Sequence, residues 1–248
     1  MIGVMGAMQE EVEELLERLD DVESTVLGSR TYHRGRLHGH PVCLAFSGWG
    51  KVAAASTATS MIDRFGVSEL WFSGVAGGLA PDLAVGDIVV ADALYQHDLD
   101  ASPIFPALEI PLLGVSALRP SALDVERAVA AAQRFVDGLT DGGGSKLVGG
   151  APLPTPRVVV GTVASGDQFV ASEAARQGVQ TKVPGVLCVE MEGAAVAQVA
   201  VERALPFGVV RVISDAASEG ADVDFTAFIE GVARYYLAGI VGHLIEGS

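Results

Sequence analysis

Acidic side chains follow several short apolar segments of this 248-residue sequence, at points where buried strands would end. The acids that share this placement are Glu10, Glu11, Asp167, Glu190, Glu192 and Asp215. Burying a carboxylate is costly unless the group is paired or hydrogen-bonded. Several carboxylates at such ends are typical of a pocket in which shifted pKa values support proton transfer. The pattern therefore predicts an enzyme that uses acid/base catalysis.

Each of these acids also has a structural interpretation when it is considered alone. Glu192 would interact favourably with the dipole of a helix that starts after it, and Asp215 would cap the turn after its strand. Glu190 would pair with an arginine, and Arg211, in the middle of an apolar strand, needs an anionic partner in either case. Open α/β sheets bind ligands at the carboxyl ends of their strands. The joint occurrence of the acids at such ends favours a functional site.

Strands and helices alternate along the whole sequence and must position these residues. The predicted strands are Ile2–Gly6, Thr31–Leu37, Val42–Phe46, Leu70–Ser73, Asp87–Leu94, Val158–Ala164, Val186–Val189 and Phe207–Ile213. The predicted helices are Gln9–Leu19, Val52–Phe65, Ser121–Val136, Ala171–Gly178, Gly193–Arg203 and Phe225–Ile245. The glycine-rich residues 74–78 are expected to separate two strands, and the glycine- and proline-rich residues 138–156 are expected to be a surface loop. The alternation predicts an α/β fold, a single domain over residues 1–248 with a central mixed twisted β-sheet flanked by helices.

The composition argues against several classes of protein. The net charge is −15, with only three lysines, which disfavours binding of nucleic acid through its phosphates. No apolar run reaches the roughly 18 residues of a membrane span, and the N-terminus lacks the basic start of a signal peptide. Cys43 and Cys188 lie in apolar strand-like segments, where thiols are expected to be buried and reduced. We therefore expect a cytoplasmic protein.

One glycine motif imitates a cofactor-binding fingerprint. Gly48-Trp49-Gly50-Lys51-Val52-Ala53 lies between a strand and a helix, as in dinucleotide-binding proteins. The fingerprint also needs an acid at the end of the next strand, which here runs into Gly74, so a tight turn is favoured over an NAD(P)-linked oxidoreductase. The histidines and cysteines lack metal-ligand spacing, and no serine lies in a Gly-x-Ser-x-Gly elbow. We expect no cofactor and no metal site.

Considered together, seven segments resemble the 5′-methylthioadenosine/S-adenosylhomocysteine nucleosidases of the purine nucleoside phosphorylase superfamily. They appear in the order of that family and extend over most of the chain. The matching segments are Gly6-Ala7-Met8-Gln9-Glu10-Glu11-Val12, Ser47-Gly48-Trp49-Gly50-Lys51-Val52-Ala53-Ala54, Gly74-Val75-Ala76-Gly77-Gly78-Leu79, Val85-Gly86-Asp87-Ile88-Val89, Ser165-Gly166-Asp167-Gln168-Phe169, Val189-Glu190-Met191-Glu192-Gly193-Ala194 and Val210-Arg211-Val212-Ile213-Ser214-Asp215.

The resemblance implies hydrolysis of an adenine N-glycosidic bond through an oxocarbenium-like transition state. It implies that Asp215 is the general acid, which donates towards N7 of adenine if the apolar strand end raises its pKa. Glu11 would deprotonate the attacking water. Glu192 would accept the ribose hydroxyls and stabilise the cationic sugar. These three residues are the implied core of the chemistry.

The resemblance also implies a set of contacts around the substrate. Met191 would pack on the sugar, while Arg211, with Glu190 beside it, would hold the water and the carboxylates in register. Phe169 would stack on adenine, and the main chain of Val170 and Ser214 would lie beside the base. The implied wall of the site also includes Met8, Trp49, Val75, Ala76, Gly77 and Phe225.

Two positions depart from the family pattern. Val75 stands where many relatives carry a small hydroxyl residue, and Trp49 replaces a smaller aliphatic residue at the edge of the pocket for the 5′ substituent. Phe225 still matches an apolar wall of that pocket. We therefore expect a hydrophobic 5′ group.

Several alternatives stay open at this point. A phosphorylase would carry arginines where this chain has Glu10 and Glu11 and where it reads Phe72-Ser73-Gly74, so water is favoured over phosphate as nucleophile. A futalosine nucleosidase would release hypoxanthine, and a non-catalytic nucleoside-binding protein would lack turnover. The resemblance further implies a homodimer in which the segment after Asp98 reaches the partner's pocket.

Overall fold

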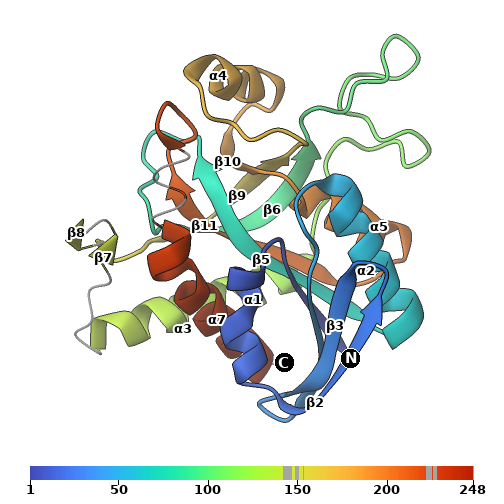
Figure 1. Ribbon diagram of the computed structural model, residues 1–248. Helices are drawn as coiled ribbons and strands as arrows, with labels where there is room; N and C mark the ends of the chain where they lie inside the picture. Colours follow the sequence, from blue (N-terminus) through green and yellow to red (C-terminus); the bar gives the residue numbers. More distant parts are fainter. Residues whose placement is uncertain (142–146, 149–150, 153, 222–224, 226–227, 248) are drawn as a thin grey trace.

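The structure is a computed structural model that describes residues 1–141, 147–148, 151–152, 154–221, 225 and 228–247. Within these ranges, the side chains of residues 10–11, 140–141, 147–148, 151–152 and 230–231 lie outside the description. The described residues form a nine-stranded sheet in the order β10-β9-β6-β11-β5-β1-β4-β3-β2 (Figure 1). Its strands are β1 (Ile2–Gly6), β2 (Asp20–Leu27), β3 (Arg30–Leu37), β4 (His40–Phe46), β5 (Glu69–Gly78), β6 (Ile88–Gln96), β9 (Val158–Ser165), β10 (Val186–Glu190) and β11 (Phe207–Asp215).

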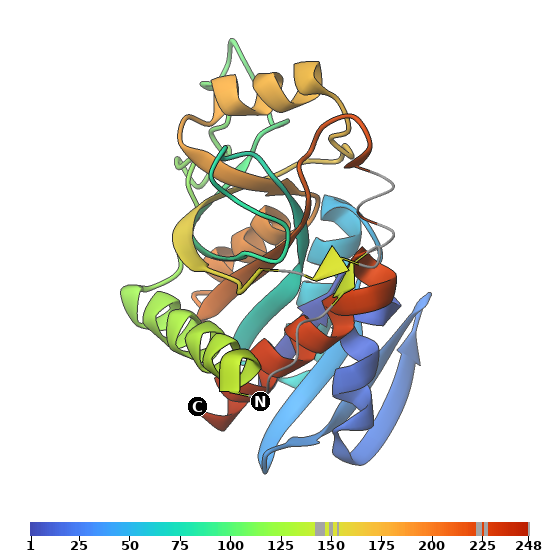
Figure 2. The ribbon, with the colours of Figure 1, turned by 90° about the vertical axis from the view of Figure 1, so that its left-hand side faces the viewer.

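Helices cover both faces of the sheet (Figures 1 and 2). On one face lie α1 (Gln9–Glu17), α3 (Ala122–Asp141) and α7 (Arg234–Glu246), which continues the short π-helical segment η1 (Ile229–Ala233). On the other face lie α2 (Lys51–Phe65) and α5 (Gly193–Glu202). The remaining helix with a full description, α4 (Glu173–Lys182), packs with the ends of β9 and β10. The predicted α/β fold with a mixed sheet flanked by helices is confirmed.

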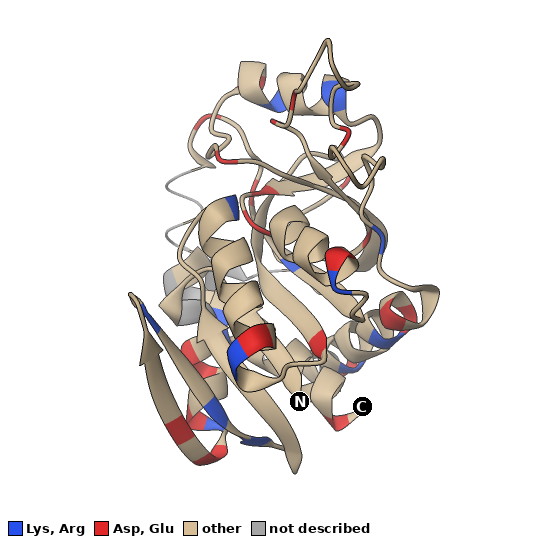
Figure 3. Cartoon of the chain, turned by 90° about the vertical axis from the view of Figure 1, so that its right-hand side faces the viewer, with Lys and Arg blue, Asp and Glu red and all other residues tan. Residues whose placement is uncertain are grey.

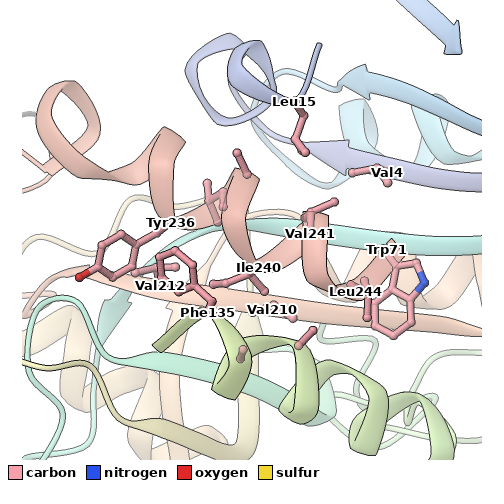
Figure 4. Close-up of a cluster of buried hydrophobic side chains, with 14 of the residues drawn as sticks. Val4, Leu15, Trp71, Phe135, Val210, Val212, Tyr236, Ile240, Val241 and Leu244 are labelled. Carbon is pink, nitrogen blue, oxygen red and sulfur yellow. The ribbon is translucent and has the colours of Figure 1, made fainter. Parts of the chain in front are cut away.

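The central strands are apolar on both faces because both are covered by helices. Successive side chains of a strand point to opposite faces. In β5, Trp71 and Val75 therefore enter the core beneath α3 and α7, while Phe72 and Ala76 enter the core beneath α2 and α5. Figure 4 shows the first of these cores, where Trp71, Phe135 and Tyr236 pack among aliphatic side chains of β1, β11 and α7.

Small side chains bring the helices of the second core close to the sheet. Ala54 and Ala58 of α2 and Ala194 and Ala197 of α5 have no exposed surface. The two cysteines lie in the same core and are free, as the sequence predicted. Burial raises the pKa of the Cys43 thiol to about 12, so this thiol stays protonated at neutral pH. No described helix has both the length and the hydropathy that a membrane span requires.

The structure corrects the expected boundary at the glycine-rich segment. Residues 74–78 were expected to separate two strands, but β5 continues through them to Gly78. Arg211 and Ile213 of β11 pair with Gly74 and Ala76 along one edge, and β10 pairs with the end of β5. Main-chain pairing from neighbouring strands therefore overrides the weak strand propensity of glycine.

Two further segments differ from the expectations. Strand β2 was not predicted, because its side chains are mostly exposed and lack an apolar alternation; it is held as an edge strand by pairing with β3. Residues 138–156 were expected to form one loop, but α3 continues to Asp141, and β7 (Leu147–Val148) pairs with β8 (Ala151–Pro152). The rest of that segment up to residue 153 lies outside the described residues.

Gly208 offers a direct test of the packing around Trp71. A Cβ atom at Gly208 would lie 2.0 Å from Cζ3 of the Trp71 indole, which is 2% exposed. We expect Gly208→Ala to lower the free energy of unfolding by about 1–3 kcal/mol, because the indole must leave its rotamer. Gly138→Ala is the matched control, since its Cβ would meet open space in the exposed part of α3.

The control substitution is expected to raise stability by about 0.5–1 kcal/mol through its effect on backbone entropy. Urea denaturation of both variants measures the two changes in one assay. Equal midpoints for Gly208→Ala and the wild type would contradict the tight packing of β11 against the indole.

Candidate functional site

A cavity of about 580 Å³, partly open to solvent, lies at one edge of the sheet. It is lined by residues that end or follow β1, β4, β5, β9, β10 and β11, so it lies at the carboxyl ends of these strands. The lining residues are Ala7, Met8, Trp49, Val75, Ala76, Gly77, Gln168, Phe169, Val170, Val189, Glu190, Met191, Glu192, Arg211, Ser214, Asp215 and Phe225. Open α/β sheets bind their ligands at this position.

All residues that the resemblance implied for the site, and whose side chains are described, line this one cavity, whereas Asp167, one of the acids singled out from the sequence, lies outside its wall. Sequence reasoning missed three of its wall residues, Ala7, Gln168 and Val189. Each of the three is the direct neighbour of a predicted residue within the same motif, and this adjacency is the signal that could have identified them. The shared location brings the residues together; the individual roles in catalysis and binding stay predictions.

Arg211 and Glu190 form a buried ion pair at the floor of the cavity. Their side chains are 1% and 3% exposed, and Nη2 of Arg211 donates to Oε2 of Glu190. The guanidinium lies over the Phe72 ring, 4.1 Å from its centroid. The arginine in the middle of an apolar strand therefore has the anionic partner that the sequence required.

Main-chain amides complete the surroundings of the Glu190 carboxylate. The N–H of Glu192 donates to it at 3.0 Å, and the N–H of Gly193 donates to both of its oxygens at 2.8 and 3.0 Å. The Ser165 hydroxyl donates to the same carboxylate and accepts from the N–H of Ala194 at 2.7 Å. Glu190 thus anchors the first turn of α5 to β9 and β11.

Glu192 lies at the N-cap position of α5 and is 5% exposed. Its Oε1 atom accepts a hydrogen bond of 2.7 Å from the N–H of Gly50. Gly50 has φ of +93°, and a Cβ atom there would lie 2.9 Å from Oδ1 of Asp167. Both the backbone conformation and the short distance to Asp167 therefore require glycine at this position. The next amide, that of Lys51, donates to Asp167 Oδ1 at 2.8 Å. The two amides of the predicted tight turn therefore donate hydrogen bonds to carboxylates of the protein, those of Glu192 and Asp167.

Asp215 ends β11 and is 3% exposed. Its Oδ2 accepts a hydrogen bond of 2.8 Å from the Ser214 hydroxyl, and its Oδ1 accepts one of 2.8 Å from the N–H of Ala217. The carboxyl group is thereby held at the cavity wall by its own strand end. These hydrogen bonds set the orientation of the carboxyl group, which a role as proton donor would require.

Aromatic side chains form an apolar group at the more exposed part of the cavity. The Phe225 ring contacts Phe169 edge-on at 5.7 Å between centroids and Trp49 edge-on at 6.1 Å. Phe169 is 39% and Trp49 is 55% exposed, in contrast to the buried acids. The cavity therefore combines an acidic floor with an aromatic mouth, a combination suited to a ligand that is polar at one end and flat and apolar at the other.

Glu11 is the predicted site residue that the described side chains do not include. Helix α1 starts at Gln9, directly after Met8 of the cavity wall, so the main chain of Glu11 lies in the first helical turn beside the cavity. Its side chain is outside the described part of the structure. Its role as catalytic base stays a prediction.

The charges of the described cavity wall are three acids and one base. Glu190, Glu192 and Asp215 are the acids, and Arg211 is the cationic residue among the described lining side chains. Its guanidinium is engaged by Glu190. Within the described residues, no group of three or more His, Cys, Asp or Glu side chains is arranged to hold a metal ion.

Comparisons with known proteins agree with this geometry. The family model described as the phosphorylase superfamily matches residues 1–246. A 5′-methylthioadenosine/S-adenosylhomocysteine nucleosidase from Mycobacterium tuberculosis is 35% identical over 238 residues, which cover 94% of this chain and 92% of the relative. An aminodeoxyfutalosine nucleosidase from Helicobacter pylori is 37% identical over 236 residues, which cover 94% of this chain and 93% of the relative.

A solved structure extends the similarity to three dimensions. The 5′-methylthioadenosine/S-adenosylhomocysteine nucleosidase from Neisseria meningitidis, in complex with methylthio-immucillin-A, superposes with a TM-score of 0.88 at 31% identity. The superposition covers 100% of this chain and 99% of that chain. The resemblance inferred from the sequence motifs is confirmed. The chain therefore belongs to the phosphorylase superfamily and, within it, to the family of the 5′-methylthioadenosine/S-adenosylhomocysteine nucleosidases.

Proposed function

We propose that this protein hydrolyses the N-glycosidic bond of 5′-methylthioadenosine, S-adenosylhomocysteine or both, releasing adenine and a 5-thioribose product. The observation that carries the proposal is the gathering of Asp215, Glu192 and Phe169 around one cavity at the strand ends. Such a site offers a proton donor, an anion and a stacking surface to one ligand. The curated relatives with this activity support the same reaction.

In the proposed reaction, the carboxyl group of Asp215 donates its proton to N7 of adenine. The electron pair of the C1′–N9 bond leaves with the base, and positive charge develops on the ribose ring. The anionic Glu192, held by the Gly50 amide, stabilises this cation. Water attacks C1′, and Glu11 accepts its proton. Phe169 stacks on the departing base.

Water is the proposed nucleophile because the described wall of the cavity offers no available cation for a phosphate dianion. Arg211 is the cationic lining residue among those described, and its guanidinium already neutralises Glu190. Glu192, which is ionised in the proposed reaction, would repel a dianion that approached the sugar.

The futalosine type of substrate is the second candidate. The aminodeoxyfutalosine nucleosidase relative is as similar to this chain as the other relatives are, at 37% identity. Trp49 and Phe225, which contact each other edge-on at the mouth, support an apolar 5′ substituent in either case. The two candidates therefore differ in the 5′ group, and release of hypoxanthine instead of adenine would identify futalosine as the substrate.

Base release tests the function directly. Purified protein is incubated with methylthioadenosine, S-adenosylhomocysteine, futalosine and aminodeoxyfutalosine, with and without phosphate, and the products are separated by chromatography. We expect adenine from at least one adenine nucleoside at a rate that phosphate does not change. A strict requirement for phosphate would overturn the water assignment, and the absence of any released base would favour a nucleoside-binding protein.

Two substitutions test the assigned roles. We expect Asp215→Asn to abolish turnover while transition-state-like ligands still bind weakly, because the amide cannot donate the proton. Glu11→Gln is expected to lower kcat at least ~100-fold, in line with the loss of a general base. Wild-type rates in Asp215→Asn would disprove the general acid, and a small loss in Glu11→Gln would move water activation to Glu192.

We also propose that the protein is a homodimer. Large apolar side chains are exposed on α2 and on the segment after β6, namely Val52 at 81%, Ile104 at 83% and Leu112 at 100%. Figure 3 shows that the helices on this side carry charged residues mainly at their ends. Large apolar side chains that are exposed in this way support contact with a second copy.

Light scattering tests the assembly. We expect about twice the chain mass of 25.6 kDa for the wild type, and a shift towards that single-chain mass for Leu112→Glu. Leu123→Glu is the control, because Leu123 is also exposed, at 65%, but lies on α3 at the opposite face of the sheet. A monomeric wild type would disprove the dimer.

A further inference from the structure

Three charged residues outside the cavity wall form a closed ring of hydrogen bonds. Nζ of Lys51 donates to Oδ1 of Asp98 at 2.5 Å, and the N–H of Asp167 donates to Oδ2 of Asp98 at 2.8 Å. The N–H of Lys51 donates to Oδ1 of Asp167 at 2.8 Å and completes the ring. The ring joins the start of α2, the segment after β6 and the segment after β9.

Two members of the ring, Lys51 and Asp167, are close in sequence to residues of the cavity wall or to its support, and Asp98 links the two. Lys51 follows Gly50, whose amide donates to the Glu192 carboxylate, and Trp49 precedes that glycine. Asp167 lies two residues before Phe169. The ring thus fixes the two loops that hold Glu192, the mouth tryptophan and the stacking phenylalanine.

The ring lies at the surface, and its Lys51–Asp98 ion pair is partly shielded from solvent. The side chains of Lys51 and Asp98 are only 16% and 31% exposed. Burial alone would raise the pKa of the Asp98 carboxyl, but hydrogen bonds from the Lys51 ammonium and the Asp167 amide, with the charge of Lys51, hold it below its usual range. A depressed pKa means that the ionised form is retained on folding, so the ring is lost only as the pH falls into the acidic range.

We propose that Lys51, Asp98 and Asp167 are positioning residues that hold the Gly50 amide against Glu192 and so set the orientation of this catalytic carboxylate. The inference rests on the proposed function, because it assigns the ring to the same site. The ring acts through Glu192 and touches no substrate. Its contribution is therefore expected in the rate and not in the stability of the fold.

The test compares Asp98→Asn with a matched control. The control is Asp63→Asn, because Asp63 also joins α2 to a distant segment, with Arg203 Nη1 and Nη2 at 2.8 and 3.2 Å from its oxygens. That pair lies at the far end of α2 and lines no part of the cavity. Both substitutions remove one charge and keep the shape of the side chain.

We expect Asp98→Asn to lower kcat/KM about 10- to 100-fold, as small displacements of a catalytic group do, with most of the loss in kcat. The Asp63→Asn variant keeps the wild-type rate, and the melting temperatures of the two variants agree. In a Glu192→Gln background, Asp98→Asn is expected to cost about twofold or less, because the residue that the ring orients is already removed.

Two kinetic results would overturn the inference. One is a wild-type rate in Asp98→Asn. The other is an undiminished loss in the Glu192→Gln background, which would show that Asp98 acts independently of Glu192. A wild-type protein that releases no base would instead disprove the proposed function.

Tryptophan fluorescence tests the ring without turnover. Trp49 is 55% exposed and next to Gly50, whereas the second tryptophan, Trp71, is 2% exposed. Acrylamide quenching therefore reports on Trp49. We expect stronger quenching in Asp98→Asn than in Asp63→Asn, because loss of the ring would make the loop with Trp49 and Gly50 more mobile. Equal quenching in both variants and the wild type would contradict the proposal that the ring fixes this loop.

Discussion

The site depends above all on the buried ion pair between Arg211 and Glu190. Two charges in an apolar sheet are tolerated only when each has a partner and further hydrogen bonds, and removal of one partner from such a pair costs about 3–5 kcal/mol. Glu190 meets this requirement with three main-chain hydrogen bonds and the Ser165 hydroxyl, while Arg211 also lies on the Phe72 ring. The pair joins β10 to β11, the two strands that lead to Glu192 and Asp215.

The main chain holds each of the acids that face the cavity. The Gly193 amide holds Glu190, the Gly50 amide holds Glu192, and the Ala217 amide holds Asp215. Fixed donors of this kind need no reorganisation when charge develops on a substrate, which is the condition for efficient electrostatic stabilisation. The acidic floor is thus rigid, whereas the aromatic mouth consists of side chains that are partly exposed.

Much of the fold and the location of the site follow from local sequence. Long apolar segments such as Phe207–Ile213 predict strands buried on both faces, and the acids that follow them predict a site at the strand ends. Strand β2 escapes such reasoning because its exposed side chains carry no apolar pattern, and its pairing with β3 is what makes it a strand. The extended conformation of Gly74–Gly78 could not be predicted in this way either, because pairing with β10 and β11, which are distant in sequence, determines it.

Hydrogen bonds between residues that are distant in sequence could not be predicted from the sequence. Local sequence predicted an arginine partner for Glu190 and a helix start at Glu192, but it did not predict that Glu192 would accept a hydrogen bond from the Gly50 amide 142 residues away. The ring of Lys51, Asp98 and Asp167 likewise could not be predicted from the sequence, because its members lie on three separate segments. The motifs identify the family, and the hydrogen bonds assign each acid its neighbours.

Anchoring by main-chain amides has an evolutionary consequence. Most residue types present the same N–H group, but the three donors are constrained in place. Gly50 has a positive φ, a Cβ at Gly193 would lie 3.1–3.2 Å from Leu94, Glu190 and Val209, and Ala217 is fully buried with φ of +49°. The floor therefore tolerates little change. The mouth is built instead from whole side chains, namely Trp49, Phe169 and Phe225. Mutation of Trp49 or Phe225, which do not stack on the base in the proposed reaction, would therefore reshape the mouth while the proposed reaction survives. One scaffold can in this way acquire new 5′ specificities by single substitutions at its rim.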